Sequence, residues 1–539
     1  MARLSRLLLL IVAGCGPASA GIASNPLQRV RAIKVEPPPW VREQYDKLPG
    51  EWKERLRAVG KYVRTKPRRS LGFYVALRLY IAHVRIQLEK RAALKAFRAL
   101  GPATTNGAMH ITVVTTAALP WKTGTAVNAL LRVAYLAELG HNVTLVVPWI
   151  HPDEQATVFP GGISYATPAL QEAQMREWLE ARDGEHKPFQ IKFYPARYDI
   201  VRGSILPLGD LTKWSADEKA ARDLCVLEEP EHLTWYHGHR NWRRRFKMVL
   251  GVVHTNYIAY AEQYQPENVW VVRWFNELVC RVYCDRVVKL SDCLQQLPRA
   301  TVCNVHGVRS EFIAEGRRRA ANTREARKFE QKGAYFIGKL LWAKGHKLLI
   351  EYLSGEEEES VSGRQRTLVD VFGDGEDRQD VEEKAKEAGL NMRFMGGKDH
   401  ADPALHGYKV FVNPSRTEVL STTTAEALAM GKFVVIERHP SNAFFYDFPN
   451  ALLFSTPEEF RAKLFLALST KPQPLTPEES RALSWAGATE RFLQKVEEAS
   501  QIVRTPSIRD EYAHLVHRAL SGHQGYAGDA LKHFVFESG

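Results

Sequence analysis

Two glutamates, Glu418 and Glu426, have the types and the spacing that most directly predict chemistry. Glu418 lies in a polar loop after the apolar run 408–412, a predicted buried strand, and Glu426 lies in a predicted helix from Thr422 to Gly431. The free N–H groups and the dipole at a helix start attract phosphate, and a nearby carboxylate can accept hydrogen bonds from two sugar hydroxyls. The pair therefore predicts a ligand with phosphate and sugar, although either glutamate alone suits a capped helix with a solvated acid.

A basic turn is predicted after another strand. Lys339 and Lys344 lie beside glycines in residues 336–345, where two ammonium groups can neutralise a leaving diphosphate. Two solvated lysines are the alternative interpretation. Gly373 lies in the glycine-containing strand end 371–375, which alone is a weak signal for a loop that approaches a ligand.

A histidine and a glycine are the candidates in the first half of the chain. His254 follows the predicted strand 247–253, where it can hydrogen-bond a sugar hydroxyl or accept a proton near neutral pH. A strand-end histidine with satisfied hydrogen bonds is the alternative. Gly124 lies in the turn 119–126 before a predicted helix, and its lack of a side chain would let the backbone approach a ligand.

Together these segments resemble the retaining glycosyltransferases of the GT4 group, which have the two-domain GT-B fold. The resemblance implies that Glu426 binds the ribose of a sugar nucleotide and that Glu418 contacts the donor sugar. It also implies that Lys339 and Lys344 hold the donor diphosphate, with lysine at a first position that is often arginine in the family. The loop at Gly373 would lie near the nucleotide base.

Longer segments narrow the resemblance to the digalactosyldiacylglycerol synthase family of plastids. These segments are collinear within about residues 108–495 and comprise 116–126, 227–233, 235–238, 251–257, 304–307, 398–402, 441–442 and 483–485. The resemblance implies retaining transfer of galactose from UDP-galactose to monogalactosyldiacylglycerol. It also assigns His254 to the active site with Glu418 and Lys344, because lipid-directed GT4 enzymes carry a histidine in the corresponding loop.

No Asp-x-Asp motif occurs in the sequence, so nothing marks a divalent metal at the diphosphate. Charge neutralisation would fall to Lys339, Lys344 and the helix N-terminus, and we expect a transferase that needs neither a metal nor another cofactor. No well-placed nucleophile is evident, which favours a front-face attack in which the leaving oxygen accepts the acceptor's proton. Three alternatives stay open: another GT4 lipid or polysaccharide glycosyltransferase, a sugar-nucleotide epimerase, or a non-catalytic nucleotide-binding membrane scaffold.

Two successive alternations of strands and helices must position these residues. Strand 111–115, helix 127–139 and strand 143–147 make a βαβ unit, which builds a parallel sheet. The pattern predicts two Rossmann-like doubly wound α/β domains, which the GT-B resemblance places face to face across a cleft. The other predicted elements are strands 191–194, 225–227, 286–290, 301–305, 334–337, 368–372, 392–395, 433–436 and 452–454, with helices 347–353, 377–388 and 476–499.

The predicted domain boundaries follow from these patterns. They are a signal peptide at 1–20, a basic and partly helical membrane-associating extension at 21–106, an acceptor domain at 107–307, a linker at 308–332, a nucleotide-sugar domain at 333–470, and C-terminal helices and tail at 471–539. The linker is expected because its residues are charged and poor in apolar side chains.

The positive charge is concentrated in the extension. The net charge of +13 comprises +15 in residues 1–100 (21 basic minus 6 acidic residues) and −2 in the rest, so nucleic-acid binding by the body is disfavoured. Within 71–100 an apolar helical stripe from Phe73 to Leu88 either packs on the body or seeks an anionic membrane. Arg3 and Arg6, a short apolar core and a small-residue site predict a secretory-type signal. The resemblance implies a peripheral protein of the plastid envelope, at its outer membrane, which this signal would reach by a secretory-type route.

Overall fold

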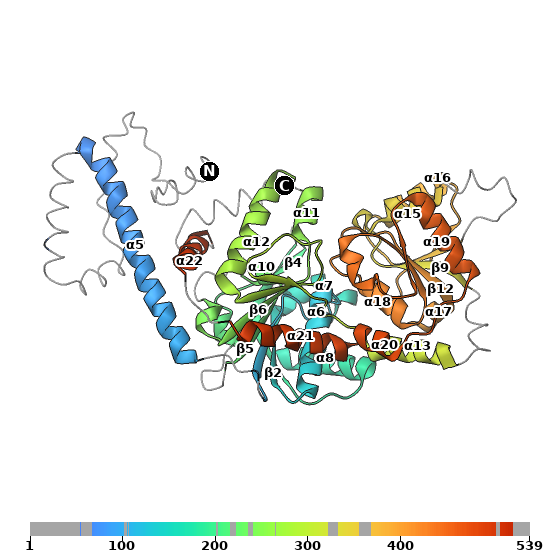
Figure 1. The fold of residues 1–539 in the computed structure, drawn as a ribbon, viewed down its shortest axis with the longest axis horizontal. Helices are drawn as coiled ribbons and strands as arrows, with labels where there is room; N and C mark the ends of the chain where they lie inside the picture. Colours follow the sequence, from blue (N-terminus) through green and yellow to red (C-terminus); the bar gives the residue numbers. More distant parts are fainter. Residues whose placement is uncertain are drawn as a thin grey trace. The chain divides into compact units, whose positions relative to one another are not determined.

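The structure is a computed structural model that describes residues 54, 67–101, 105, 107–200, 203–215, 222–234, 241–264, 266–321, 332–354, 368–502 and 507–520. The predicted signal peptide, the motif 235–238 and most of residues 21–66 lie outside the described residues. Residues 95–505 form one compact unit, and residues 1–94 with 506–539 form another. Both sheets belong to the first of these units (Figure 1).

The first domain is built on an eight-stranded sheet of order β4-β3-β2-β1-β5-β6-β7-β8. All neighbours pair in parallel except β3 and β4. This antiparallel edge strand was not predicted, because its four residues carry too short a pattern to detect. The strands are β1 (His110–Val114), β2 (Asn142–Ile150), β3 (Gln190–Asp199), β4 (Ser204–Pro207), β5 (Leu224–Glu228), β6 (Met248–Val253), β7 (Arg286–Lys289) and β8 (Ala300–Val302).

The second domain is built on a six-stranded parallel sheet of order β11-β10-β9-β12-β13-β14. Central strands such as β12 are buried at every residue, which is why they are nearly continuous apolar runs in the sequence. The prediction of two doubly wound α/β domains, the basis of the GT-B fold, is confirmed. The strands are β9 (Lys332–Ile337), β10 (Val369–Phe372), β11 (Met392–Phe394), β12 (Tyr408–Asn413), β13 (Phe433–Glu437) and β14 (Ala451–Phe454).

Helices connect most of the successive strands of each sheet. Those of the first domain are α6 (Gly124–Glu138), α7 (Pro152–Val158), α8 (Pro168–Asp183), α9 (Thr212–Ser215), α10 (Pro230–Leu233), α11 (Tyr257–Tyr264) and α12 (Val269–Tyr283). Those after it are α13 (Ser310–Ala321), α15 (His346–Ser354), α16 (Arg378–Glu387), α17 (Pro403–His406), α18 (Thr422–Ala429), α19 (Pro457–Ser469), α20 (Pro477–Leu483) and α21 (Trp485–Ser500).

Helix α13 lies within the segment 308–332 that was predicted to be a linker. Residues 310–321 are helical, with Phe312, Ile313 and Glu315 buried. Gly316 lets this helix approach α18, because a Cβ atom there would lie 2.0 Å from the carbonyl oxygen of Ala429. Part of the charged segment is therefore a helix with one buried face, and its role as a linker stays a prediction.

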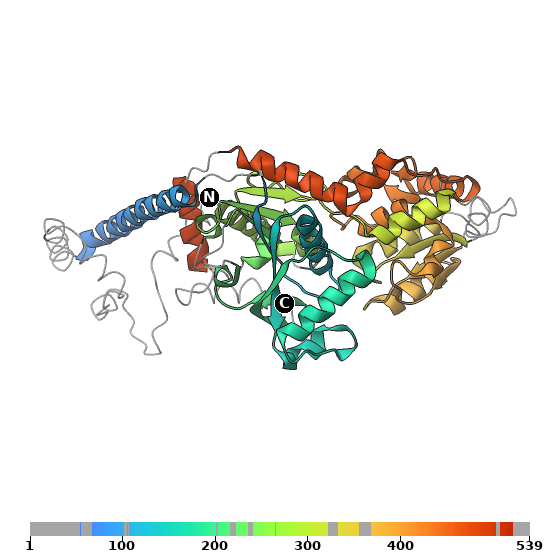
Figure 2. The same ribbon diagram turned by 90° about the horizontal axis from the view of Figure 1, so that it is seen from below.

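The C-terminal segment returns to the first domain. The predicted single helix 476–499 is two helices, α20 and α21, because Ser484 has extended backbone and caps α21 by accepting a hydrogen bond from the Gly487 N–H at 3.1 Å. Helix α21 packs on α6 and β6 of the first domain, and its orange-red ribbon can be followed in Figure 2. The first domain therefore depends on residues that follow the second one in sequence.

The helix predicted within the extension is confirmed as α5 (Pro67–Leu100). Of its predicted apolar stripe, Val84 and Leu88 are 36% and 49% exposed, whereas Ile86 lies outside the stripe and is fully buried. A second helix, α22 (Ile508–Leu520), belongs to the same compact unit as residues 67–94 of α5. Among the helices that the structure describes, none combines the length and the apolar character needed to cross a membrane.

Candidate functional site

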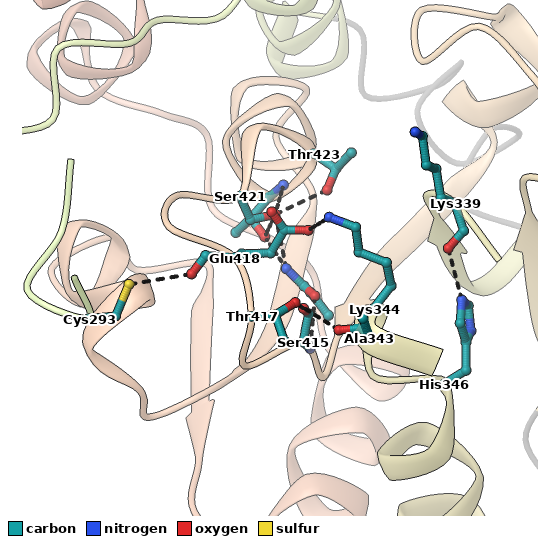
Figure 3. Close-up of polar contacts among 12 residues, drawn as sticks. Cys293, Lys339, Ala343, Lys344, His346, Ser415, Thr417, Glu418, Ser421 and Thr423 are labelled. Atoms are coloured by element: carbon teal, nitrogen blue, oxygen red, sulfur yellow. Dashed lines mark hydrogen bonds and ion pairs between the residues drawn. The ribbon is translucent and has the colours of Figure 1, made fainter. Parts of the chain in front are cut away.

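An ion pair joins two of the predicted residues. Lys344 Nζ lies 2.6 Å from Glu418 Oε1, and the two side chains are 24% and 27% exposed, so a ligand can still reach them (Figure 3). Burial opposes the charge on the lysine, but the Glu418 carboxylate prevails and raises the pKa of Lys344. The pair therefore presents a permanent cation beside a carboxylate, which suits a ligand with an anionic part and a hydroxyl-rich part.

The loop that carries Glu418 is held by its own polar side chains. Asn413 Nδ2, at the end of β12, donates to Ser421 Oγ at 2.9 Å and to Thr424 Oγ1 at 3.1 Å. Ser421 caps α18 by accepting from the Thr424 N–H at 3.2 Å. Thr417 Oγ1 donates to the Ala343 carbonyl at 2.7 Å, which ties this loop to the turn that carries Lys344. The predicted strand, polar loop and helix start are therefore confirmed as one local unit.

Lys339 occupies the same turn but does not share this ion pair. Its side chain is exposed and, as Figure 3 shows, its ammonium group lies apart from Lys344 and Glu418. Its backbone carbonyl accepts a hydrogen bond from His346 Nε2 at 3.1 Å. The predicted basic pair thus consists of one lysine fixed by a carboxylate and one lysine directed toward solvent.

Gly373 has a packing reason to be glycine. Its φ is +143°, and a Cβ atom there would lie 1.8 Å from the carbonyl oxygen of Gly338, the neighbour of Lys339. The end of β10 can therefore lie directly against the lysine turn only without a side chain. This places the loop beside the candidate site, while its contact with a nucleotide stays a prediction.

Glu426 is paired with a histidine, His400, for which no role was predicted. Glu426 lies in the first turns of α18, and its Oε2 is 2.8 Å from Nδ1 of His400. Burial favours the neutral imidazole, but the Glu426 carboxylate prevails and raises the pKa of His400. His400 lies in the segment 398–402 that carried part of the resemblance, and only the tertiary fold reveals its partner.

His254 lies in the first domain and contacts two residues that the sequence analysis did not assign. Its Nε2 hydrogen-bonds Oε2 of the buried Glu228, and its ring lies 4.7 Å from that of His306, measured between centroids. The His254 side chain is only 6% exposed. The position of Glu228 in the sequence could have predicted this contact. Glu228 ends β5 and His254 directly follows β6, and these two strands are neighbours in the sheet.

Contacts within the larger unit connect the two domains at this site. Ser291 Oγ donates to the Val419 carbonyl, and Cys293 Sγ donates to the Glu418 carbonyl at 3.6 Å. Tyr260 of α11, in the first domain, lies close enough to Lys344 to add to the increase in its pKa. The helix that follows the His254 loop therefore approaches the turn that carries Lys344.

Gly124 is the exposed first residue of α6, where Thr123 caps the helix by accepting from the Ala126 N–H at 3.3 Å. An added Cβ would meet Asn128 Nδ2 at 3.6 Å, an ordinary contact, so packing does not require glycine at this position. Its predicted approach to a ligand stays a prediction. Within the ranges that the structure describes, no group of three or more His, Cys, Asp or Glu side chains could hold a metal ion.

Comparisons with known proteins show which families this chain is similar to. Residues 331–469 match the family described as glycosyl transferases group 1. The chain is 47% identical over 388 residues to digalactosyldiacylglycerol synthase 1, chloroplastic, of Glycine max, covering 71% of this chain and 49% of that protein. It is 43% identical over 401 residues to digalactosyldiacylglycerol synthase 2, chloroplastic, of Arabidopsis thaliana, covering 74% of this chain and 83% of that protein.

The chain thus spans about half the length of the longer relatives and most of the shorter ones. Among solved structures, sucrose-phosphate synthase from Thermosynechococcus elongatus is similar over 72% of this chain and 98% of its own, with 13% identity and a TM-score of 0.43.

The His400–Glu426 pair predicts a pH-dependent contribution to stability. Because the folded pKa of His400 is raised, this contribution is complete below the unfolded value of about 6.5 and is lost as the pH rises through the folded value. We expect Glu426→Gln to lower the free energy of unfolding more at about pH 5.5 than at about pH 9. The effect should not exceed about 1 kcal/mol, because His400 is 37% exposed.

Urea unfolding at both pH values measures this difference. Glu418→Gln is the matched control, since its partner Lys344 keeps its charge throughout this range and its effect should not change with pH. Equal destabilisation by Glu426→Gln at the two pH values would contradict the assignment.

Proposed function

The chain belongs to the digalactosyldiacylglycerol synthase family, and from this premise we propose that it transfers galactose from UDP-galactose to monogalactosyldiacylglycerol with retention of anomeric configuration. The observation that carries the proposal is 43% identity across 83% of the length of a digalactosyldiacylglycerol synthase. The ion pair of Lys344 with Glu418 supports it, because it offers a cation for a diphosphate and a carboxylate for a sugar 2.6 Å apart.

In this proposal the second domain binds the donor. Glu426, held by His400, accepts hydrogen bonds from the ribose hydroxyls, and Glu418 contacts the galactose. Lys344 neutralises the diphosphate where it meets the sugar, and Lys339 approaches it from the solvent side. The first turn of α18, in which Ser421 already accepts from the Thr424 N–H, adds its remaining N–H donors to the same anion. The loop at Gly373 borders the base, and the helix start at Gly124 approaches the donor from the first domain.

The acceptor would be bound by the first domain, with His254 next to the reacting hydroxyl. That hydroxyl attacks the anomeric carbon from the face of the leaving group, the bond from this carbon to the diphosphate oxygen breaks, and the diphosphate oxygen takes the hydroxyl proton. The developing negative charge is neutralised by Lys344 and the helix start, so no metal or other cofactor enters the reaction. His254 contributes a hydrogen bond to a sugar hydroxyl or a transient site for the proton.

We further propose that the protein is peripheral on the plastid envelope and that residues 21–106 contact anionic lipid there. The relatives named above are chloroplastic, and Val84 and Leu88 on α5 are exposed apolar side chains in a strongly basic segment. Basic side chains near an anionic surface contribute about 1 kcal/mol each, an attraction that salt screens. Sedimentation with anionic vesicles at increasing salt tests this contact, and equal binding to uncharged vesicles would contradict it.

The reaction is tested with the full chain, radiolabelled UDP-galactose and monogalactosyldiacylglycerol in liposomes. We expect a digalactosyl lipid with an α-linkage from the α-configured donor, at the same rate with and without excess EDTA. A different accepted donor or acceptor would reassign the substrates, an inverted product would exclude retention, and loss of activity in EDTA that added metal restores would contradict the metal-free reaction.

Lys344→Ala should lower turnover more than it weakens binding of UDP-galactose. The diphosphate gains charge as it leaves, so its cation acts mainly in the transition state. We expect kcat to fall roughly 100-fold, while the Kd measured by calorimetry changes much less. Lys347→Ala is the control, since Lys347 is 68% exposed and pairs loosely with Glu351 at 3.9 Å. Equal losses in kcat and in affinity would show that Lys344 acts only in ground-state binding.

A further inference from the structure

A buried ion pair lies behind His254 and has no part in the proposed donor site. Arg132 Nε, on α6, lies 2.6 Å from Glu228 Oε1 at the end of β5, and both side chains are fully buried. Arg132 also donates from Nη1 to the Val305 carbonyl at 3.1 Å. Burying two charges is costly unless their geometry is fixed by further bonds, so this pair needs a reason beyond stability.

The second carboxylate oxygen of Glu228 supplies that reason. While Glu228 Oε1 is held by Arg132, Oε2 hydrogen-bonds His254 Nε2. Burial favours the protonated acid, but Arg132 and then His254 prevail and lower the pKa of Glu228 to about 2. An ionised carboxylate can only accept hydrogen bonds, so the proton of this contact is on Nε2. Nδ1 is then the ring nitrogen that is left to accept a hydrogen bond.

Two other charged or titratable groups near the ring, Arg132 and His306, do not act as its counter-charge. Arg132 is covered by the ring of Phe492, 4.8 Å from the guanidinium carbon to the ring centroid. His306, which lies against the His254 ring, is fully buried, and burial, with the nearby charges of His254 and Arg132, keeps its pKa well below the ordinary value. Glu228 is thus the counter-charge in contact with the imidazole.

Glu229 holds the loop that carries the histidine. Its backbone has φ 63°, the left-handed region that non-glycine residues seldom adopt. This turn directs its carboxylate to the loop after β6, where it accepts from Thr255 Oγ1 and, at 3.2 Å, from the Tyr257 hydroxyl. It also accepts from Thr116 Oγ1 at 3.3 Å. Two consecutive carboxylates therefore fix the ring of His254 and the backbone that follows it.

We propose that Glu228, supported by Arg132, is a positioning residue that holds His254 as the Nε2–H donor, so that Nδ1 accepts a hydrogen bond from a hydroxyl of the acceptor sugar. This rests on the proposed function, which places the acceptor in the first domain. It gives a role to the segment 228–232, whose charged residues are otherwise hard to explain at the end of a buried strand.

Glu228→Gln tests the proposal, because an amide has one accepting oxygen where the carboxylate has two. If that oxygen stays with Arg132, the amide NH₂ faces His254 Nε2, and the ring must carry its proton on Nδ1. We expect either the KM for monogalactosyldiacylglycerol to rise or kcat to fall by roughly 10- to 100-fold, because one charged hydrogen bond is lost. The affinity for UDP-galactose should not change.

Asp223→Asn is the matched control. Asp223 directly precedes β5 and forms an ion pair with Lys247 at 2.8 Å, so this variant also removes a carboxylate from an ion pair of the first sheet. Asp223 has no contact with His254 among the interactions of the described residues. We expect lower stability with unchanged KM and kcat. If Glu228→Gln matches this control in both KM and kcat, the pair is only structural and the proposal is wrong.

The tautomer can be measured without galactosyl transfer. In the full chain labelled with ¹⁵N-histidine, the ring signals that disappear in His254→Gln should show protonated Nε2 and unprotonated Nδ1 in the neutral form of the ring. Protonated Nδ1 in the wild type would overturn the proposal even if the variant fails to fold. A wild type with this tautomer but no transfer to monogalactosyldiacylglycerol would instead contradict the proposed function, and the two failures are thus distinguishable.

Discussion

Parallel strand pairing is the constraint on which the candidate site depends. In a parallel sheet all carboxyl ends meet at one edge, so the loops that follow neighbouring strands must lie together. Strands β10, β9 and β12 are neighbours, and they are followed by Gly373, by the turn of Lys344 and by the loop of Glu418. Strands β5 and β6 are neighbours in the other sheet and bring Glu228 to His254. Distances along the chain of 26 to 74 residues thereby become direct contacts.

Three pairs of oppositely charged or hydrogen-bonded groups lie at these edges. Lys344 is held by Glu418, His400 by Glu426, and His254 by Glu228. A polar group whose position is fixed before a ligand arrives loses little freedom on binding, and its dipole need not reorganise as charge develops. The pairs differ in exposure, from the partly open Lys344 and Glu418 to the closed contact behind His254. The partly exposed pairs are suited to contact with a ligand. The buried Glu228–His254 pair is suited to holding the imidazole ring in place.

The pattern of apolar and polar residues along the chain predicted most of the strands and helices. The side-chain pairs between distant residues were the hardest feature to predict. Alternating apolar runs revealed both sheets, and the strand, loop and helix around Glu418 were predicted almost to the residue, because their signals lie within about twenty positions. The antiparallel strand β4 and the helix α13 were missed, since one is short and the other is helical through packing on α18. Arg132 was passed over within an apolar helix, because its partner Glu228 is 96 residues away. Such pairings are determined by tertiary structure alone.

The return of α21 to the first domain has a consequence for the order of synthesis. Trp485 and Phe492 of this helix cover Arg132, so the guanidinium behind His254 loses its aromatic cover in any nascent chain that ends before residue 485. A growing polypeptide emerges from the ribosome with the first sheet long before α21 exists. The core of the first domain therefore stays incomplete, with part of its interior open to solvent, until the second domain has been translated. The last step in assembling its core is the arrival of a segment made almost 360 residues after Arg132.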